Sequence, residues 1–204
     1  MYKRFIKRVL DIMMAVMGLP LLLLAFVMIG PMIYLEDRGP IFYNAPRLGK
    51  DGRIFTMYKF RSMKVNSPDI RNEDGSTFSS EDDPRLTRIG RFIRKTSIDE
   101  LPQLLNVLKG DMSIVGPRPP VPGSNPVRLN GRAGKRYEVR PGITGYAQAF
   151  FRNSISQAEK FAYDTEYVEN LSFLLDVRVL VATFATVALR RDVFTNVTSS
   201  RREI

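Results

Sequence analysis

The 204-residue sequence contains no cysteine and no histidine. These two absences exclude disulfide bonds, thiol nucleophiles, zinc sites built from cysteine or histidine, and every catalytic Ser-His or Cys-His arrangement. Any catalysis must therefore use Asp, Glu, Lys, Tyr or Arg, with an oxygen-binding metal such as Mg²⁺ as a suitable partner. The lack of cysteine also agrees with a cytosolic environment.

Positive charge dominates what the sequence does contain. Lys and Arg number 31 against 21 Asp and Glu, which gives a formal net charge of +10. Such a balance points to an anionic partner, which is a nucleic acid, an acidic lipid surface or a phosphorylated substrate, and composition alone leaves the three open. The length predicts one domain with a real core and room for a small appendage.

A long apolar segment lies near the N-terminus. Residues 12–35 carry no charge and follow a basic start that contains Lys3, Arg4, Lys7 and Arg8. This length of apolar chain is typical of membrane segments. A cleaved signal peptide has a similar beginning, but no small-x-small cleavage site follows here, so we expect residues 1–36 to be a retained membrane element.

Two topologies of this element stay open. Basic residues flank both ends, with Arg38, Arg47, Lys50 and Arg53 after the apolar run, and a helix that enters the membrane and turns back keeps both ends in the cytoplasm. Pro20 is the predicted bend point, because it deletes a hydrogen bond and clashes with the Val16 carbonyl. The arm before it is about 12 Å long, short of a ~30 Å hydrocarbon core. A kinked single-pass anchor is the alternative to this re-entrant hairpin.

Residues 40–63 predict two extended runs joined by a Gly-Lys-Asp-Gly turn at residues 49–52. Strand alternation places Lys59 and Arg61 on the same face, two residues apart, where they could address one phosphate group. The commoner fate of such a pair is a solvated strand face.

The segment SIDELPQLLNVLKG predicts a helix. Leucines recur at helical spacing and Lys109-Gly110 supplies a stop signal, so Asp99 and Glu100 sit at the helix start. With Ser97 as N-cap, Glu100 would complete a capping box, whereas Asp99 as N-cap would use its own carboxylate. Capping is the simplest explanation of the two carboxylates when the motif is taken alone.

Arginines around the carboxylate pair favour a second explanation. Arg94 precedes the pair by five residues, Arg118 lies among prolines in GPRPP, and RYEVRPG adds Arg136 and Arg140. A rigidly presented guanidinium is well suited to hold a diphosphate through its planar fork. The combination suggests a phosphate site. Further on, residues 170–191 predict an apolar helix that packs in the core or lies at the membrane interface.

The motifs KRVLD, YKFRSM, DELPQLLNVLKGDMSIVGPRP and VRPGITGYAQ occur in this order, together with the apolar segment. In these motifs the sequence resembles the small monotopic phosphoglycosyl transferases, the bacterial sugar transferases that start glycoconjugate and polysaccharide assembly. The resemblance covers nearly the whole chain. One departure concerns the helix break, which is typically Ser-Pro in the family and is Leu19-Pro20 here.

The resemblance implies an enzyme at the cytoplasmic face of the bacterial inner membrane. Such enzymes move a sugar 1-phosphate from a UDP-sugar to undecaprenyl phosphate and release UMP, with Mg²⁺ as the cofactor. Carried over, Asp99 is the nucleophile that forms a covalent aspartyl intermediate, Glu100 is its partner, and both lie at the metal. The residues expected to bind substrate phosphates are Lys59, Arg61, Arg94, Arg118 and Arg140.

The expected fold is α/β (α+β): a re-entrant membrane hairpin over residues 1–36, a cytosolic domain with a small sheet and interfacial amphipathic helices over 37–190, and a frayed tail over 191–204. The expected partners are the sugar donor, the lipid acceptor and the bilayer, with no nucleic acid, and dimerisation stays open. Two alternatives are a membrane-anchored basic protein that binds nucleic acid or lipid without catalysis, and a metal-dependent phosphatase or diphosphatase.

Overall fold

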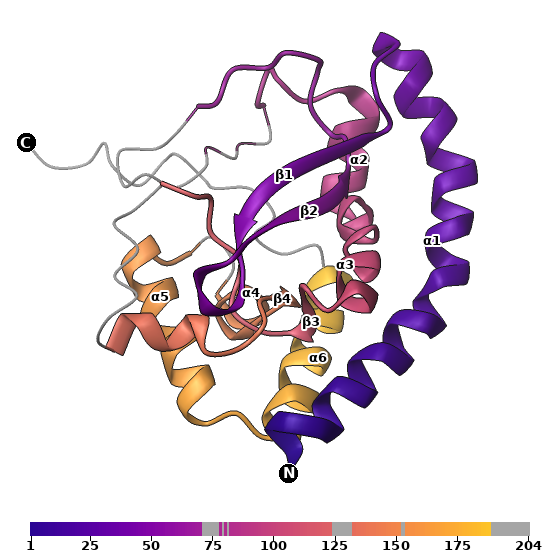
Figure 1. Ribbon diagram of the computed structural model, residues 1–204. Coiled ribbons are helices and arrows are strands. Elements are labelled where there is room, and N and C mark those ends of the chain that lie inside the picture. The colour runs from indigo at the N-terminus through magenta and orange to yellow at the C-terminus, as the bar shows by residue number, and fades with distance from the viewer. Residues whose placement is uncertain (71–77, 79, 81, 124–131, 152–153, 189–204) are drawn as a thin grey trace, which may run out of the picture.

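A computed structural model describes residues 1–70, 78, 80, 82–123, 132–151 and 154–188 of the chain. Figure 1 shows a small body of short helices and strands with one long helix along its side. The main elements are α1 (Lys7–Asp37), β1 (Phe42–Leu48), β2 (Ile54–Phe60), α2 (Arg88–Lys95), α3 (Gln103–Lys109), β3 (Ser113–Val115), β4 (Gly142–Thr144), α4 (Tyr146–Phe150), α5 (Gln157–Glu169) and α6 (Phe173–Ala188). The predicted tail, 191–204, lies outside the described residues.

Two small sheets confirm the mixed α and β character expected from the sequence. β1 and β2 form an antiparallel hairpin whose register runs from Phe42 opposite Phe60 to Leu48 opposite Ile54. Its turn contains Asp51 at φ 56° and Gly52 at φ 72°, which is the left-handed geometry that a Gly-Lys-Asp-Gly sequence supplies. β3 and β4 form a second, parallel pair.

α1 is one continuous helix of 31 residues that contains both Pro20 and Pro31. At ~1.5 Å per residue it is about 46 Å long. Figure 1 shows it bowed around one side of the molecule rather than folded back on itself. Each proline removes only one backbone hydrogen bond, and the helix continues past that loss. The hairpin break at Pro20 is therefore not confirmed.

The N-terminal end of α1 is tied to the body by buried polar contacts. Asp11 accepts hydrogen bonds from the Ser113 hydroxyl and the Ile114 amide, both at 2.9 Å. Lys7 forms an ion pair of 2.7 Å with Asp176 of α6, which also accepts hydrogen bonds from the hydroxyls of Tyr2 and Tyr167. These contacts fix the start of α1 against β3, α5 and α6.

The C-terminal end of α1 is tied to the same body. Both oxygens of Asp37 accept from the Arg61 guanidinium at 2.6 Å, just after β2. The Glu36 carboxylate accepts from the backbone amides of Arg88 and Ile89, in the first turn of α2. Because both ends of α1 are held by one body, we expect the two ends to lie on the same side of any membrane that this helix enters.

The middle of α1 presents an apolar outer face. Its most hydrophobic 18-residue window is only 17% buried, which is far less than a core helix of this composition would be. α6 buries Val179, which confirms packing of one face in the core, and it also exposes large apolar side chains. Its placement at a membrane interface stays a prediction. The exposed side chains of the two helices include Met17, Leu23, Leu24, Val27, Met28, Phe173, Leu174, Val181 and Phe184.

Cysteine labelling tests the placement of the two ends, because the natural chain has no cysteine to give background. We expect Lys3→Cys and Lys64→Cys, at exposed positions beyond the two ends of α1, to react with a membrane-impermeant maleimide from the same side of membrane vesicles. Leu24→Cys, on the exposed apolar face, is expected to be protected by lipid. Labelling of Lys3→Cys and Lys64→Cys from opposite sides would show instead that α1 spans the membrane.

Candidate active site

The two carboxylates lie on a short 3₁₀ turn, Ile98–Glu100, which follows Ser97 in the left-handed conformation at φ 57°. α3 begins only after Pro102, which has no N–H with which to continue a helix from the preceding turn. In this described stretch neither Ser97 nor Pro102 makes a side-chain cap. Ser97 stands at the N-cap position, as one register predicted, but forms no capping box with Glu100, and α3 begins after Pro102 rather than after Asp99. Capping therefore occupies neither carboxylate.

Cations from distant parts of the chain converge on this turn. The Lys59 ammonium, on β2, lies 2.7 Å from Oε1 of Glu100 and 3.9 Å from Oδ2 of Asp99. The Arg118 guanidinium, from the loop after β3, lies 3.5 Å from the same Glu100 oxygen. Lys59 is mostly buried, whereas the Arg118 side chain is 57% exposed and so is available to a ligand.

Arg94 approaches the pair from α2. Its Nε donates to the Ser62 hydroxyl at 2.9 Å, and its charge acts on the Asp99 carboxyl. Gly90, one turn earlier, allows this close approach, because a Cβ there would meet the Ser62 carbonyl oxygen at 1.8 Å. Lys59, Arg94 and Arg118 are thus brought to the predicted carboxylate pair.

Asn106 fixes the distance between the strand that carries Lys59 and the helix that follows the carboxylates. It is completely buried in α3, accepts from the Tyr58 amide at 2.9 Å and donates to the Thr56 carbonyl at 2.7 Å. Through these two bonds the side-chain amide of Asn106 satisfies backbone groups of β2 that a neighbouring strand would otherwise pair. The sequence reasoning did not select Asn106 or Ser62, although one polar residue inside LLNVL was a signal.

The other two predicted cations lie elsewhere. β2 ends at Phe60, so strand alternation does not extend to Arg61, which instead binds Asp37 at the end of α1. Arg140 donates from Nε to the Gly110 carbonyl at 2.8 Å, at the C-terminal end of α3. The carboxylates lie at the opposite end of that helix, so the structure does not bring Arg61 or Arg140 to the pair.

The two neighbouring carboxyls have opposite pKa shifts. Burial raises the pKa of Asp99 to about 6, against the attraction of the Lys59 ammonium. Burial acts on Glu100 in the same direction, but the Lys59 ammonium and the Arg118 guanidinium outweigh it and lower the pKa of Glu100 to about 2. At neutral pH both groups are ionised, with Asp99 the more basic of the two.

A divalent metal is compatible with this donor set. Within the residues that the structure describes, no group of three or more Asp and Glu side chains is gathered for a metal ion. Mg²⁺ does not need such a cage, because one or two carboxylates suffice when substrate phosphates and water complete its octahedron. Asp99 and Glu100 fit that role.

Two ionised carboxylates faced by three cations are compatible with a phosphorylated substrate, and the longest helix of the same body is apolar enough for a membrane. The comparisons with known proteins agree with that class. The family model described as "Bacterial sugar transferase" matches residues 2–190. The chain belongs to this family.

Individual relatives support the same assignment. The chain is 44% identical over 178 residues to the uncharacterized sugar transferase EpsL of Bacillus subtilis (strain 168), covering 87% of this chain and 85% of EpsL. It is 42% identical over 191 residues to the galactosyl transferase CpsE of Streptococcus agalactiae serotype III (strain NEM316), with coverage of 90% and 42%. It is 42% identical over 205 residues to the undecaprenyl-phosphate galactose phosphotransferase of Salmonella typhimurium (strain LT2), with coverage of 93% and 41%. The chain thus spans less than half the length of the latter two.

Substitutions of the two carboxylates are expected to change stability in opposite directions at neutral pH. The raised pKa of Asp99 means that its protonated form stabilises the fold, fully below pH of about 4, and that this stabilisation is lost as the pH rises through about 6. At neutral pH the ionised carboxylate therefore costs stability, and Asp99→Asn, which has no such charge, should raise the unfolding midpoint by a few degrees. Glu100→Gln should lower it, because the depressed pKa of Glu100 marks a stabilisation that is present above its unfolded pKa and lost only as the pH falls through about 2.

Thermal unfolding of the detergent-solubilised proteins at neutral pH and at a pH of about 4 checks this pair. The gain from Asp99→Asn should shrink at the lower pH, where the wild-type Asp99 carries its proton. Midpoint shifts of the same sign at neutral pH would contradict the charge distribution of the site.

Proposed function

We propose that this protein transfers a sugar 1-phosphate from a UDP-sugar to undecaprenyl phosphate and releases UMP. The observation that carries the proposal is the Asp99 carboxylate, which is buried, not used for capping, and faced by Lys59 and Arg94. The family and the name of the Salmonella relative, an undecaprenyl-phosphate galactose phosphotransferase, supply the substrate class.

The proposed reaction has two displacements at one phosphorus atom. An Asp99 oxygen attacks the sugar-linked phosphorus of the donor, the bond from that phosphorus to the oxygen bridging to UMP breaks, and UMP leaves with the electron pair. An aspartyl-phosphosugar remains. A phosphate oxygen of undecaprenyl phosphate then attacks the same phosphorus, and Asp99 leaves as a carboxylate. This division lets a water-soluble donor and a lipid acceptor use one site in turn.

The cations of the site offset the charge repulsion between a carboxylate and a diphosphate. Lys59 lies between the two carboxylates and reduces their mutual repulsion. The exposed Arg118 guanidinium binds phosphate oxygens of the donor or of the leaving UMP, and the half-buried Arg94 stabilises the ionised nucleophile. Asp99 and Glu100 would hold Mg²⁺, which would supply further positive charge to the phosphate oxygens.

The lipid acceptor requires that the site lie near the bilayer. We place the apolar outer face of α1 in the cytoplasmic leaflet of the bacterial inner membrane, with the body at the cytoplasmic surface. Both ends of α1 are tied to that body, which supports a placement of both ends at the cytoplasmic surface. The basic surface adds attraction for anionic lipid, at about 1 kcal/mol per well-placed Lys or Arg.

Release of UMP by the purified protein tests the proposal. Given Mg²⁺, undecaprenyl phosphate and a panel of UDP-sugars, we expect lipid-dependent UMP release with at least one donor. Asp99→Asn should reduce the rate by several orders of magnitude, because an amide is not a nucleophile at phosphorus. Without the acceptor, the wild-type protein should release up to one UMP per active site and hold the phosphosugar covalently, which intact-protein mass spectrometry detects.

Other outcomes of this assay would indicate a different activity. If UDP-sugar is hydrolysed, with release of UMP over many turnovers and without any lipid, the protein is a phosphatase or diphosphatase. Binding of nucleic acid or vesicles with indifference to Asp99→Asn, and no UMP with any donor, would indicate a binding protein without catalysis.

The rate of UMP release is expected to depend on pH through Asp99. Without metal, burial raises the pKa of this carboxyl to about 6, and only its ionised form attacks. Because bound Mg²⁺ would lower that pKa, the rate should rise with pH no further than about 6 and then level off, with a loss of roughly tenfold per pH unit below the pKa of the bound site. Initial rates at low donor concentration between pH of about 4.5 and 8 measure this limb, and a rate that still rises with pH above about 7 would contradict Asp99 as the group that must ionise.

A further inference from the structure

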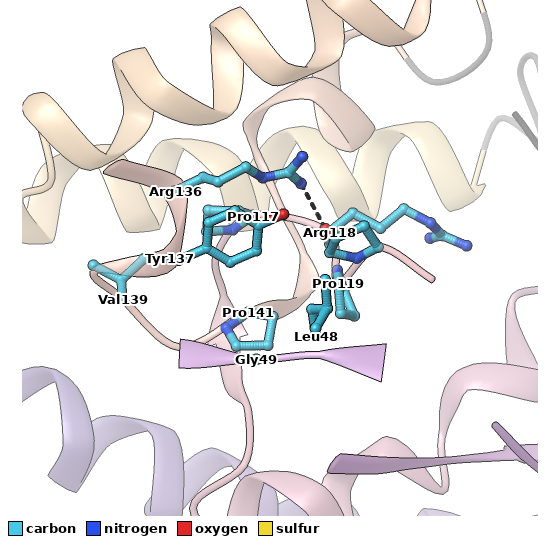
Figure 2. Close-up of a pocket in the computed structure, with 10 residues that line it drawn as sticks. Leu48, Gly49, Pro117, Arg118, Pro119, Arg136, Tyr137, Val139 and Pro141 are labelled. Atoms are coloured by element: carbon cyan, nitrogen blue, oxygen red, sulfur yellow. Dashed lines mark hydrogen bonds between the residues drawn. The ribbon is translucent and has the colours of Figure 1, made fainter. Parts of the chain in front are cut away.

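The segment that presents Arg118 is held by its carbonyl groups. Residues 116–120 read Gly-Pro-Arg-Pro-Pro, and the three prolines have no N–H to donate. The Pro117 carbonyl accepts from the Gly142 amide at 3.0 Å, and the Pro120 carbonyl accepts from the Leu48 amide at 3.0 Å. The Arg118 carbonyl accepts from Nη2 of Arg136 at 2.7 Å, a bond that is drawn in Figure 2. Of these three anchors, only the last is made by a side chain.

Arg136 is itself fixed from α5. Its Nη2 also lies 2.7 Å from Oδ2 of Asp164, and its guanidinium stacks over the Phe161 ring at 4.1 Å. The side chains of Arg136 and Asp164 are 4% and 5% exposed. A buried ion pair contributes little to stability compared with an apolar pair, because both charges lose their hydration. What this pair does supply is a fixed direction for the guanidinium.

The anchored carbonyl lies directly behind the side chain that reaches the carboxylates. Figure 2 shows the Arg118 side chain pointing away from Arg136 while its carbonyl oxygen faces the Arg136 guanidinium. A carbonyl held in place fixes the peptide plane between Arg118 and Pro119, and with it the ψ angle of Arg118. The Arg118 guanidinium then lies 3.5 Å from Glu100.

We propose that Arg136, oriented by Asp164, is a positioning residue for Arg118 and thereby sets the affinity of the site for the diphosphate of the sugar nucleotide. This inference rests on the proposed function, since it concerns the same site. Without the anchor, Arg118 must lose more conformational freedom when it binds phosphate, and the affinity falls. Neither Arg136 nor Asp164 touches the reacting atoms.

The chain offers a matched control on the same two elements. Arg136 belongs to the 3₁₀ segment Arg132–Tyr137, and this segment makes a second set of ion pairs with α5 through Glu169. Glu169 contacts Arg132 at 3.1 Å and Lys135 at 2.9 Å, both on the surface. Glu169→Gln therefore weakens the same junction without touching residues 116–120.

A double-mutant cycle on UDP binding, measured by calorimetry with Mg²⁺ and without any lipid acceptor, tests the proposal. We expect Asp164→Asn to weaken UDP binding roughly tenfold, Arg118→Ala to weaken it at least as much, and the double variant to equal Arg118→Ala. Glu169→Gln should bind as the wild type does. Effects of Asp164→Asn and Arg118→Ala that simply multiply would overturn the proposal, because Asp164 would then act independently of Arg118.

Hydrogen exchange separates this inference from the proposed transfer reaction. We expect faster exchange at the Gly142 and Leu48 amides, which donate to the carbonyls of Pro117 and Pro120 in this segment, in Asp164→Asn. Glu169→Gln should show wild-type exchange at both amides, whether or not any UDP-sugar is a substrate. Arg136→Lys, which keeps a positive charge beside Asp164 but loses the planar fork, should show the same exchange and binding defects if Asp164→Asn fails to fold. Unchanged exchange at the Gly142 and Leu48 amides in Arg136→Lys would refute the anchor even if the enzyme releases UMP as proposed.

Discussion

The contact of the Lys59 ammonium with two adjacent carboxylates is the interaction on which the site depends. Asp99 and Glu100 are neighbours in sequence and largely withdrawn from water, so their charges repel each other in a medium that screens poorly. Lys59, 2.7 Å from one and 3.9 Å from the other, offsets that repulsion and lets both stay ionised. Its position on β2 is in turn fixed by Asn106 of α3, so the hairpin, the helix and the carboxylate turn form one unit.

The long helix has an apolar middle and polar ends that are committed to the body. Asp11, near one end, accepts a hydrogen bond from the body, and Asp37, at the other end, forms an ion pair with it. This arrangement gives an apolar surface on the same molecule as the charged site, which is what the proposed reaction between a soluble nucleotide and a membrane lipid would require. The ion pair of Arg61 with Asp37 also explains why a cation two residues from Lys59 contacts α1 and not the site.

Buried polar groups fix the orientation of the elements that carry the site residues. Asn106 aligns α3 with β2, and the Arg136–Asp164 pair aligns the proline-rich segment that carries Arg118. Each costs desolvation that an apolar contact would avoid, and each makes directional bonds that an apolar contact cannot make. The geometry of the site, more than the stability of the fold, is what these groups supply.

Local patterns in the sequence determined the β1–β2 hairpin, the helix that ends at Gly110, the apolar character of α1 and the carboxylate pair, because turn residues and periodicity act over a few positions. Tertiary structure decided the rest. Which of the five predicted cations reach the carboxylates depends on partners far along the chain, such as Asp37 for Arg61 and Gly110 for Arg140. A guanidinium binds whichever oxygen the packed chain brings to it, and sequence spacing does not encode that distance.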